Sequence, residues 1–126
     1  MIDTESSKEI RVSWVELADI EKYVRSVLAV EADDIPQEKI DAGKWTLGKI
    51  PINEIMVDIE MIRKHDSQEL HVGRRDGFVT TIKLGKPILP LIVLGRDKFL
   101  VDGYARYRAL KQIGVDKVKV IFQKFD

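Results

Sequence analysis

The segment VDGYARYRAL, residues 101–110, decides how this sequence is interpreted. The apolar run 99–101 meets an Asp-Gly turn, and a helical pattern begins directly after that turn. The first N–H groups of a helix have no partner within it and lie at the positive end of its dipole. Gly103 lets a ligand approach the backbone, and Arg106 and Arg108 carry donors suited to phosphate. The segment predicts a phosphate-binding site, although an ordinary turn with solvated arginines gives the same pattern.

Hydrophobic periodicity and turn residues predict the element order α, β, α, β, β, α, β around a small mixed sheet, which is an α+β domain. Ser13 and Glu16 have the spacing of a capping box, which predicts a first helix over about 14–30. Asp66 and Glu69 predict the start of a second helix, which runs to 84 with Gly73 and Gly77 on one face, where they would permit close packing. The other expected elements are strands at 49–52 continued at 55–57, strands at 89–94 and 99–101 joined by the turn 95–98, a helix at 104–113 and a strand at 117–123.

The composition is typical of one folded domain without cysteine. The chain has 126 residues, 44% of them hydrophobic and 33% charged, with a formal net charge of zero. A non-specific nucleic-acid binder is usually basic, and the lack of cysteine excludes disulfides, thiolate metal sites and cysteine nucleophiles. No apolar run is long enough to span a bilayer, and residues 1–9 do not resemble a signal peptide. We therefore expect a cytoplasmic protein with no membrane partner.

The chain resembles the ParB/sulfiredoxin superfamily in the order and spacing of its parts. These parts are residues 85–93, the hairpin, residues 101–110, Gly114 and residues 118–120. The resemblance covers roughly 46–124. It implies a ParB/sulfiredoxin-like domain at 46–126, preceded by an N-terminal helical extension at 1–45. It also implies a nucleotide-binding fold in which the turn and the helix start hold phosphates.

Each known branch of this superfamily differs from the chain at the turn. ParB partition proteins carry Gly-Glu-Arg-Arg-x-Arg-Ala there and bind CTP with magnesium. The matching residues here are Gly103, Arg106, Arg108 and Ala109, whereas Tyr104 and Ala105 replace the glutamate and the first arginine. The helix-turn-helix that follows this domain in ParB proteins is missing from the sequence, so we expect any DNA contact to be indirect, through a partner. Tyr104 also replaces the sulfiredoxin cysteine, which excludes sulfiredoxin chemistry.

The free-serine kinase branch gives an alternative prediction. Its Asp-Gly-His-x-Arg turn matches Asp102, Gly103 and Arg106, but Tyr104 replaces the histidine. In this alternative Glu60 is the catalytic base, and Asp102 serves magnesium or the attacking hydroxyl of an ADP- or ATP-dependent kinase or nucleotide hydrolase.

Two further clusters allow more than one interpretation. The possible metal ligands Asp58, Glu60, His65, Asp66 and His71 match no compact zinc motif, and a solvated loop with a helix cap explains them. The second predicted helix carries four basic residues, which face the phosphates, face a nucleic-acid backbone or form a polar helix face: His71, Arg74, Arg75 and Lys83.

The prediction is a nucleotide-binding ParB-like domain, regulatory or partition-related, whose ligand is CTP, ATP or ADP with Mg²⁺. The expected nucleotide- or phosphate-binding residues are Asp102, Gly103, Tyr104, Ala105, Arg106 and Arg108. The resemblance also implies a homodimer. A structural or interaction domain that has lost the site is a further alternative.

Overall fold

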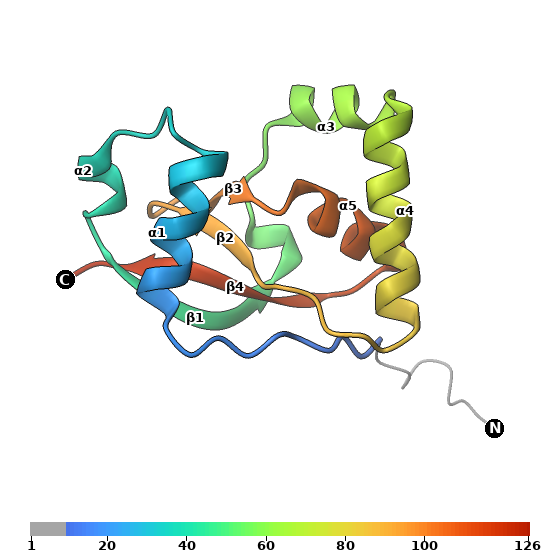
Figure 1. Cartoon of the computed structure of the whole chain (residues 1–126), viewed down its shortest axis with the longest axis horizontal. Helices are drawn as coiled ribbons and strands as arrows, with labels where there is room; N and C mark the ends of the chain where they lie inside the picture. The colour runs from blue at the N-terminus through green and yellow to red at the C-terminus, as the bar shows by residue number, and fades with distance from the viewer. Residues whose placement is uncertain (1–9) are drawn as a thin grey trace.

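A four-stranded mixed sheet forms the centre of the computed structural model, which describes residues 10–126 (Figure 1). The strands are β1 (Lys44–Pro51), β2 (Leu91–Leu94), β3 (Phe99–Asp102) and β4 (Lys117–Lys124), and their order across the sheet is β1-β4-β2-β3. β4 pairs antiparallel with β1 and parallel with β2, while β2 and β3 form an antiparallel hairpin. The sheet confirms the predicted α+β class.

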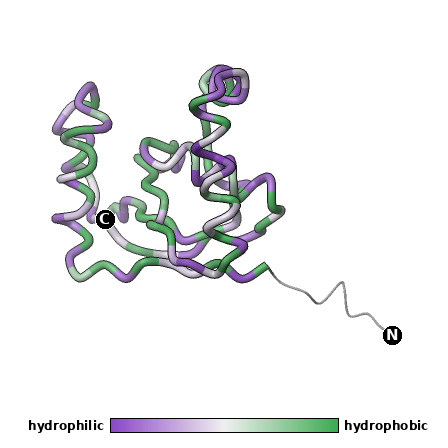
Figure 2. Tube along the Cα trace, turned by 45° about the vertical axis from the view of Figure 1, so that its right-hand side comes forward, coloured by the Kyte–Doolittle hydropathy of each residue, from purple (hydrophilic) through white to green (hydrophobic). Residues whose placement is uncertain are grey.

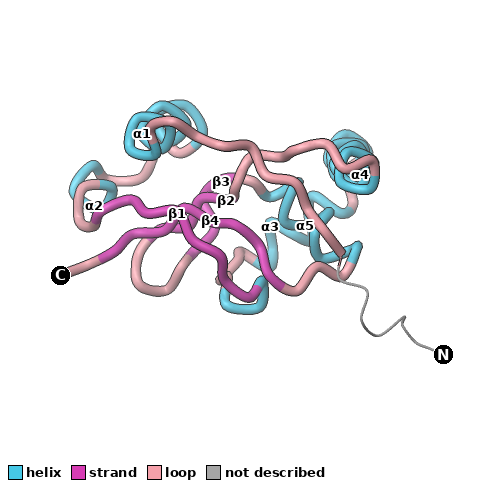
Figure 3. Tube along the Cα trace, turned by 90° about the horizontal axis from the view of Figure 1, so that it is seen from below, coloured by secondary structure: helices cyan, strands magenta, loops and turns pink. Residues whose placement is uncertain are grey.

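The helices lie around this sheet, as Figure 3 shows from below. They are α1 (Ile20–Glu31), α2 (Gln37–Ile40), the 3-10 turn η2 (Ile52–Glu54), α3 (Ile59–Asp66), α4 (Glu69–Lys83) and α5 (Tyr104–Ile113). None of the helices between residues 10 and 126 is long and apolar enough to cross a membrane.

Alternating side chains divide the core into two clusters, one on each face of the sheet. Along β4, Val118 and Val120 join the cluster that includes residues of α5, whereas Ile121 joins the cluster that contains α1. Hydrophobic and hydrophilic residues alternate around α1 (Figure 2), and its Val24 and Leu28 are buried. The N-terminal helix is therefore packed on the same sheet as the rest of the chain.

The first helix begins later than the capping box at Ser13 predicts. Asp19 is the N-cap of α1, and its carboxylate accepts from the N–H of Lys22 at 3.0 Å. The residues before it are extended, because Val15 donates to the carbonyl of Ile88 at 2.9 Å and Ile88 donates to that of Ser13 at 3.0 Å. Backbone pairing with a distant segment thus replaces the local cap, and the prediction of a helix from residue 14 was wrong at its start.

The second predicted helix is confirmed as α4, and a helix that was not predicted, α3, precedes it. α3 begins after Asp58, whose carboxylate accepts from the N–H of Met61 at 3.1 Å, and ends at Asp66 rather than beginning there. Gln68 is the N-cap of α4. A Cβ at Gly73 or Gly77 would meet nothing within 4 Å, so the predicted close packing at these glycines was also wrong.

The first strand was displaced in the prediction as well. β1 begins at Lys44, and the chain leaves the sheet after Pro51 because Ile52 turns into η2 and donates to the carbonyl of Asp116 at 2.8 Å. Only Met56 of the expected continuation forms a bridge, with Phe99. By contrast, the hairpin, the α5 helix and its end at Gly114 are confirmed.

Candidate functional site

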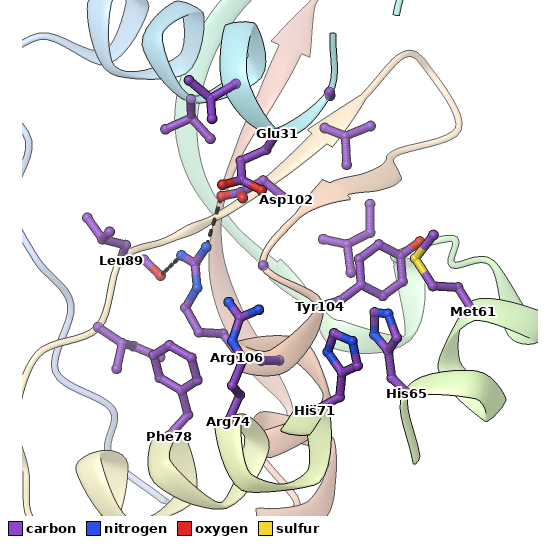
Figure 4. Close-up of a pocket in the computed structure, with 18 of the residues that line it drawn as sticks. Glu31, Met61, His65, His71, Arg74, Phe78, Leu89, Asp102, Tyr104 and Arg106 are labelled. Carbon is purple, nitrogen blue, oxygen red and sulfur yellow. Dashed lines mark hydrogen bonds and ion pairs between the residues drawn. The ribbon is translucent and has the colours of Figure 1, made fainter. Parts of the chain in front are cut away.

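A cavity of about 1210 Å³ lies over the first turn of α5 (Figure 4). Its lining comes from α1, α3, α4, β3, α5 and the segment 87–89, which are far apart in the sequence. Five of the six predicted nucleotide-binding residues line it, and these are Asp102, Gly103, Tyr104, Ala105 and Arg106. The fold therefore places the Asp-Gly turn at a cavity large enough for a small-molecule ligand.

The residues at the start of α5 that line this cavity carry unpaired backbone donors. Gly103, the N-cap, has φ +102° and provides no side chain to cap the helix. Among residues 10–126, no acceptor is found for the N–H groups of Tyr104, Ala105 and Arg106. Three free donors at the positive end of a helix favour an anion.

Arg106 lines the cavity, but protein oxygens hold its guanidinium. Nη1 donates to the carbonyls of Leu89 and Pro90 at 2.8 and 2.9 Å, and Nη2 donates to the Asp102 carboxylate at 2.9 Å. The residue is 8% exposed. Burial raises the pKa of the nearby Tyr23 hydroxyl, and the charge and hydrogen bond of Arg106 oppose that rise. Arg106 therefore has a structural role that the sequence did not indicate.

Arg108 and Glu60 do not lie with the other predicted site residues. Arg108 donates from Nε to the Asp66 carboxylate at 2.8 Å and from Nη1 to the His71 carbonyl at 3.2 Å. It lines a separate cavity of about 480 Å³. Glu60 is exposed on α3 and pairs with Arg63 at 3.2 Å. Neither side chain is part of the lining over α5.

The cationic side of the cavity comes from α3 and α4. His71 and Arg74, three residues apart on α4, both line it together with His65 of α3 (Figure 4). Arg74 forms no ion pair with any described carboxylate, whereas Arg75 contacts Asp66 at 3.5 Å and Asp76 at 3.0 Å. The sequence did not indicate which way the basic residues of α4 face. In the structure Arg74 lines the cavity, whereas Arg75 does not and pairs with carboxylates.

The two histidines are in contact with each other. Their rings stack with centroids 3.9 Å apart and an interplanar angle of 13°, and the ring of Tyr104 lies edge-on to His65 at 6.0 Å. Burial lowers the pKa of His65, and the nearby charges of His71, Arg108, Lys64 and Arg74 lower it further. The neutral form of His65 is therefore favoured, and the positive charge on this side of the cavity belongs to the neighbouring cations.

The rest of the lining is apolar, with separate carboxylates. Apolar lining residues of α1, the loop after it and α4 are Val27, Val30, Ile35 and Phe78, and the lining carboxylates are Glu31, Asp34, Asp58 and Asp102. The Asp58 carboxylate accepts a hydrogen bond from the N–H of Met61, and the Asp102 carboxylate accepts one from Arg106. Within residues 10–126, no group of three or more His, Cys, Asp or Glu is arranged to hold a metal ion.

Comparison with known proteins supports the fold. No protein-family model and no curated protein sequence matches the chain. The structure of the C2221 form of a Pnob8-like ParB-N domain matches with a TM-score of 0.50 and 26% identity, over 66% of this chain and 31% of that one. A second structure of a pNOB8-like ParB N-domain matches with a TM-score of 0.49 and 28% identity, over 66% and 29%.

A structure of sulfiredoxin from Arabidopsis thaliana also matches, with a TM-score of 0.48 and 16% identity, over 63% of this chain and 85% of that one. The chain spans about a third of the length of the ParB structures that it matches. In its mixed sheet and surrounding helices, the chain has a ParB/sulfiredoxin-like fold.

Proposed function

We propose that this chain binds a nucleotide, or a related ligand that carries phosphate groups, in the cavity over α5. The observation that carries the proposal is the meeting of two anion-binding features. Tyr104, Ala105 and Arg106, whose N–H groups have no acceptor among the described residues, line the same cavity as Arg74, which has no carboxylate partner among them. Backbone amides at a helix start and a guanidinium are both strong donors to phosphate oxygen.

The two sides of the cavity suit the two parts of a nucleotide. Phosphates would lie between the start of α5 and Arg74, while the base would contact apolar residues of α1 such as Val27. CTP, ATP and ADP are all candidates. Similarity to a ParB-N domain supports a regulatory or partition-related role. In this proposal any DNA contact is made through a partner.

Mg²⁺ would accompany the phosphates rather than occupy a site built by the protein alone. Mg²⁺ keeps several waters and needs only one or two carboxylates beside substrate phosphates. Glu31 is a carboxylate of the cavity lining with no ion pair among the described residues, and it lies near Asp102 in Figure 4. This residue therefore fits a shared magnesium ion.

The kinase alternative is not favoured by the arrangement. Its proposed base, Glu60, pairs with Arg63 outside the cavity, and the carboxylate of Asp102 is held by Arg106. Binding without turnover is therefore the function that we propose.

A thermal-shift titration with CTP, ATP, ADP and tripolyphosphate, each with and without Mg²⁺, tests binding. Ligands that bind only the folded state raise the melting temperature. We expect at least one of these ligands to raise it, and we expect Arg74→Ala to weaken that ligand about tenfold or more, since hydrogen bonds to charged groups contribute ~1.5–3 kcal/mol.

Arg75→Ala is the matched control, because it removes the neighbouring guanidinium that pairs with Asp66 and Asp76. Each variant is compared with its own ligand-free melting temperature. The proposal fails if no ligand at millimolar concentration shifts the wild type, or if both substitutions weaken binding equally.

A further inference from the structure

The stacked histidines join α3 to α4 at the basic side of the cavity. His65 is near the end of α3, His71 is in the first turn of α4, and both rings line the cavity beside Arg74 (Figure 4). Their centroid separation of 3.9 Å leaves no room for a third group between the rings. A proton on one imidazole therefore acts directly on the other.

The groups that surround the pair are mostly cations. Lys64 of α3, Arg74 of α4 and Arg108 of α5 all disfavour a charge on His65. The Asp66 carboxylate, at the end of α3, is held by Arg108 and Arg75. Asp58, the N-cap of α3, contacts the Tyr104 hydroxyl through its N–H at 3.3 Å. No carboxylate among the described residues forms an ion pair with either histidine. The pair thus lacks the counter-charge that a protonated imidazole needs.

We propose that His65 and His71 form a proton-uptake site that is coupled to anion binding in the cavity, an inference that rests on the proposed function. A phosphate group beside Arg74 supplies the missing negative charge, so the pair takes up a proton when the ligand binds. By linkage, a proton on the pair strengthens ligand binding to the same extent. The histidines thereby make the affinity of the cavity depend on pH.

The direction of this dependence follows from the charges. In the free protein the pKa of His65 is below its ordinary value of 6.5, and a neighbouring anion raises it. Between the lower pKa of the free state and the higher pKa of the bound state, binding takes up a proton. Affinity therefore increases as the pH falls through this interval, by at most about tenfold per pH unit for each proton.

Calorimetric titration with tripolyphosphate at about pH 6 and about pH 7.5, in buffers of different ionisation enthalpy, measures both affinity and proton uptake. We expect tighter binding and net uptake near pH 6. His65→Asn, His71→Asn and the double variant should lose the part of both effects that the protein contributes. The titration of tripolyphosphate itself is the same for every variant, so the difference from the wild type isolates the histidines.

The chain contains only two histidines, so the imidazole C2–H signals in a proton NMR spectrum belong to this pair. We expect the signal of His65 to titrate below pH 6.5 in the free protein and at a higher pH with tripolyphosphate. Equal pH dependence of binding in the wild type and the double variant, or no ligand-induced change in either histidine signal, would overturn the inference.

The two proposals fail differently. Binding that depends on Arg74 but has the same pH profile without the histidines removes only the proton-uptake site. Absence of tripolyphosphate and nucleotide binding at both pH values removes the proposed function, and the coupling with it.

Discussion

The guanidinium of Arg106 donates to the carboxylate of Asp102 at 2.9 Å, and their side chains are only 10% and 13% exposed. The same guanidinium holds the carbonyls of Leu89 and Pro90. It therefore ties the end of β3 and the start of α5 to the segment that leads into β2. Arg106 shapes the wall of the cavity, and Arg74 is the arginine of the lining with no ion pair among residues 10–126.

Arg106→Met should destabilise the fold by ~3 kcal/mol, because it leaves the Asp102 carboxylate, the buried carbonyl of Pro90 and the part-buried carbonyl of Leu89 without their donor. Urea unfolding measures the loss. Arg63→Ala is the control: it breaks an exposed pair with Glu60, and we expect a change below about 0.5 kcal/mol. A similar small change for Arg106→Met would show that the buried contacts contribute little.

Gly103→Ala should cost more stability than Gly114→Ala. Both glycines have positive φ, +102° and +92°, which costs alanine ~1–2 kcal/mol. At Gly103 a Cβ would also lie 2.7 Å from Leu91 Cδ2 and 3.1 Å from Arg106 Nη2, whereas at Gly114 it would meet nothing within 4 Å. We expect the first substitution to exceed the second by about 1 kcal/mol or more in denaturant unfolding. Equal costs would exclude steric crowding at the turn.

Gly73→Ala should stabilise the protein by ~0.5–1 kcal/mol, because alanine is a better helix former and a Cβ there meets nothing within 4 Å. Gly77→Ala should have a similar effect for the same reason. Thermal unfolding of the ligand-free protein measures both. Destabilisation by either substitution would contradict the open space found around these two positions.

Stability of the ligand-free protein should decrease as the pH falls below about 6.5. The folded state lowers the pKa of His65, so the unfolded chain binds the proton more readily in this interval, and acid favours unfolding. His65→Asn should reduce this part of the pH dependence. The melting temperature across about pH 5 to 8 checks the prediction, and an unchanged slope in the variant would contradict it.

Local patterns were sufficient for the strand, turn and helix around residues 99–113. Gly103 and Gly114 mark both ends of α5, and the hairpin before it needs only a four-residue turn, so neighbouring residues decide these elements. The same locality explains why the resemblance to the ParB/sulfiredoxin fold is visible in this part of the sequence.

Distant contacts decided what the local patterns missed. Ser13 is not a helix cap because residues 13–15 pair with Ile88, and Asp66 ends a helix while it holds Arg108. Arg106 was predicted to face phosphate, but carbonyls from segment 89–90 hold it in the wall of the cavity. No spacing in the sequence indicates which carbonyls will surround a given arginine.

By itself, the sequence determined where α5 starts and that its first amides would be free, because both depend on residues adjacent in the chain. Only the tertiary structure decided which cation faces those amides. Arg74 lines the same cavity, and His65 meets His71, because α4 packs against both α5 and α3, an arrangement that depends on burial between segments far apart in the chain.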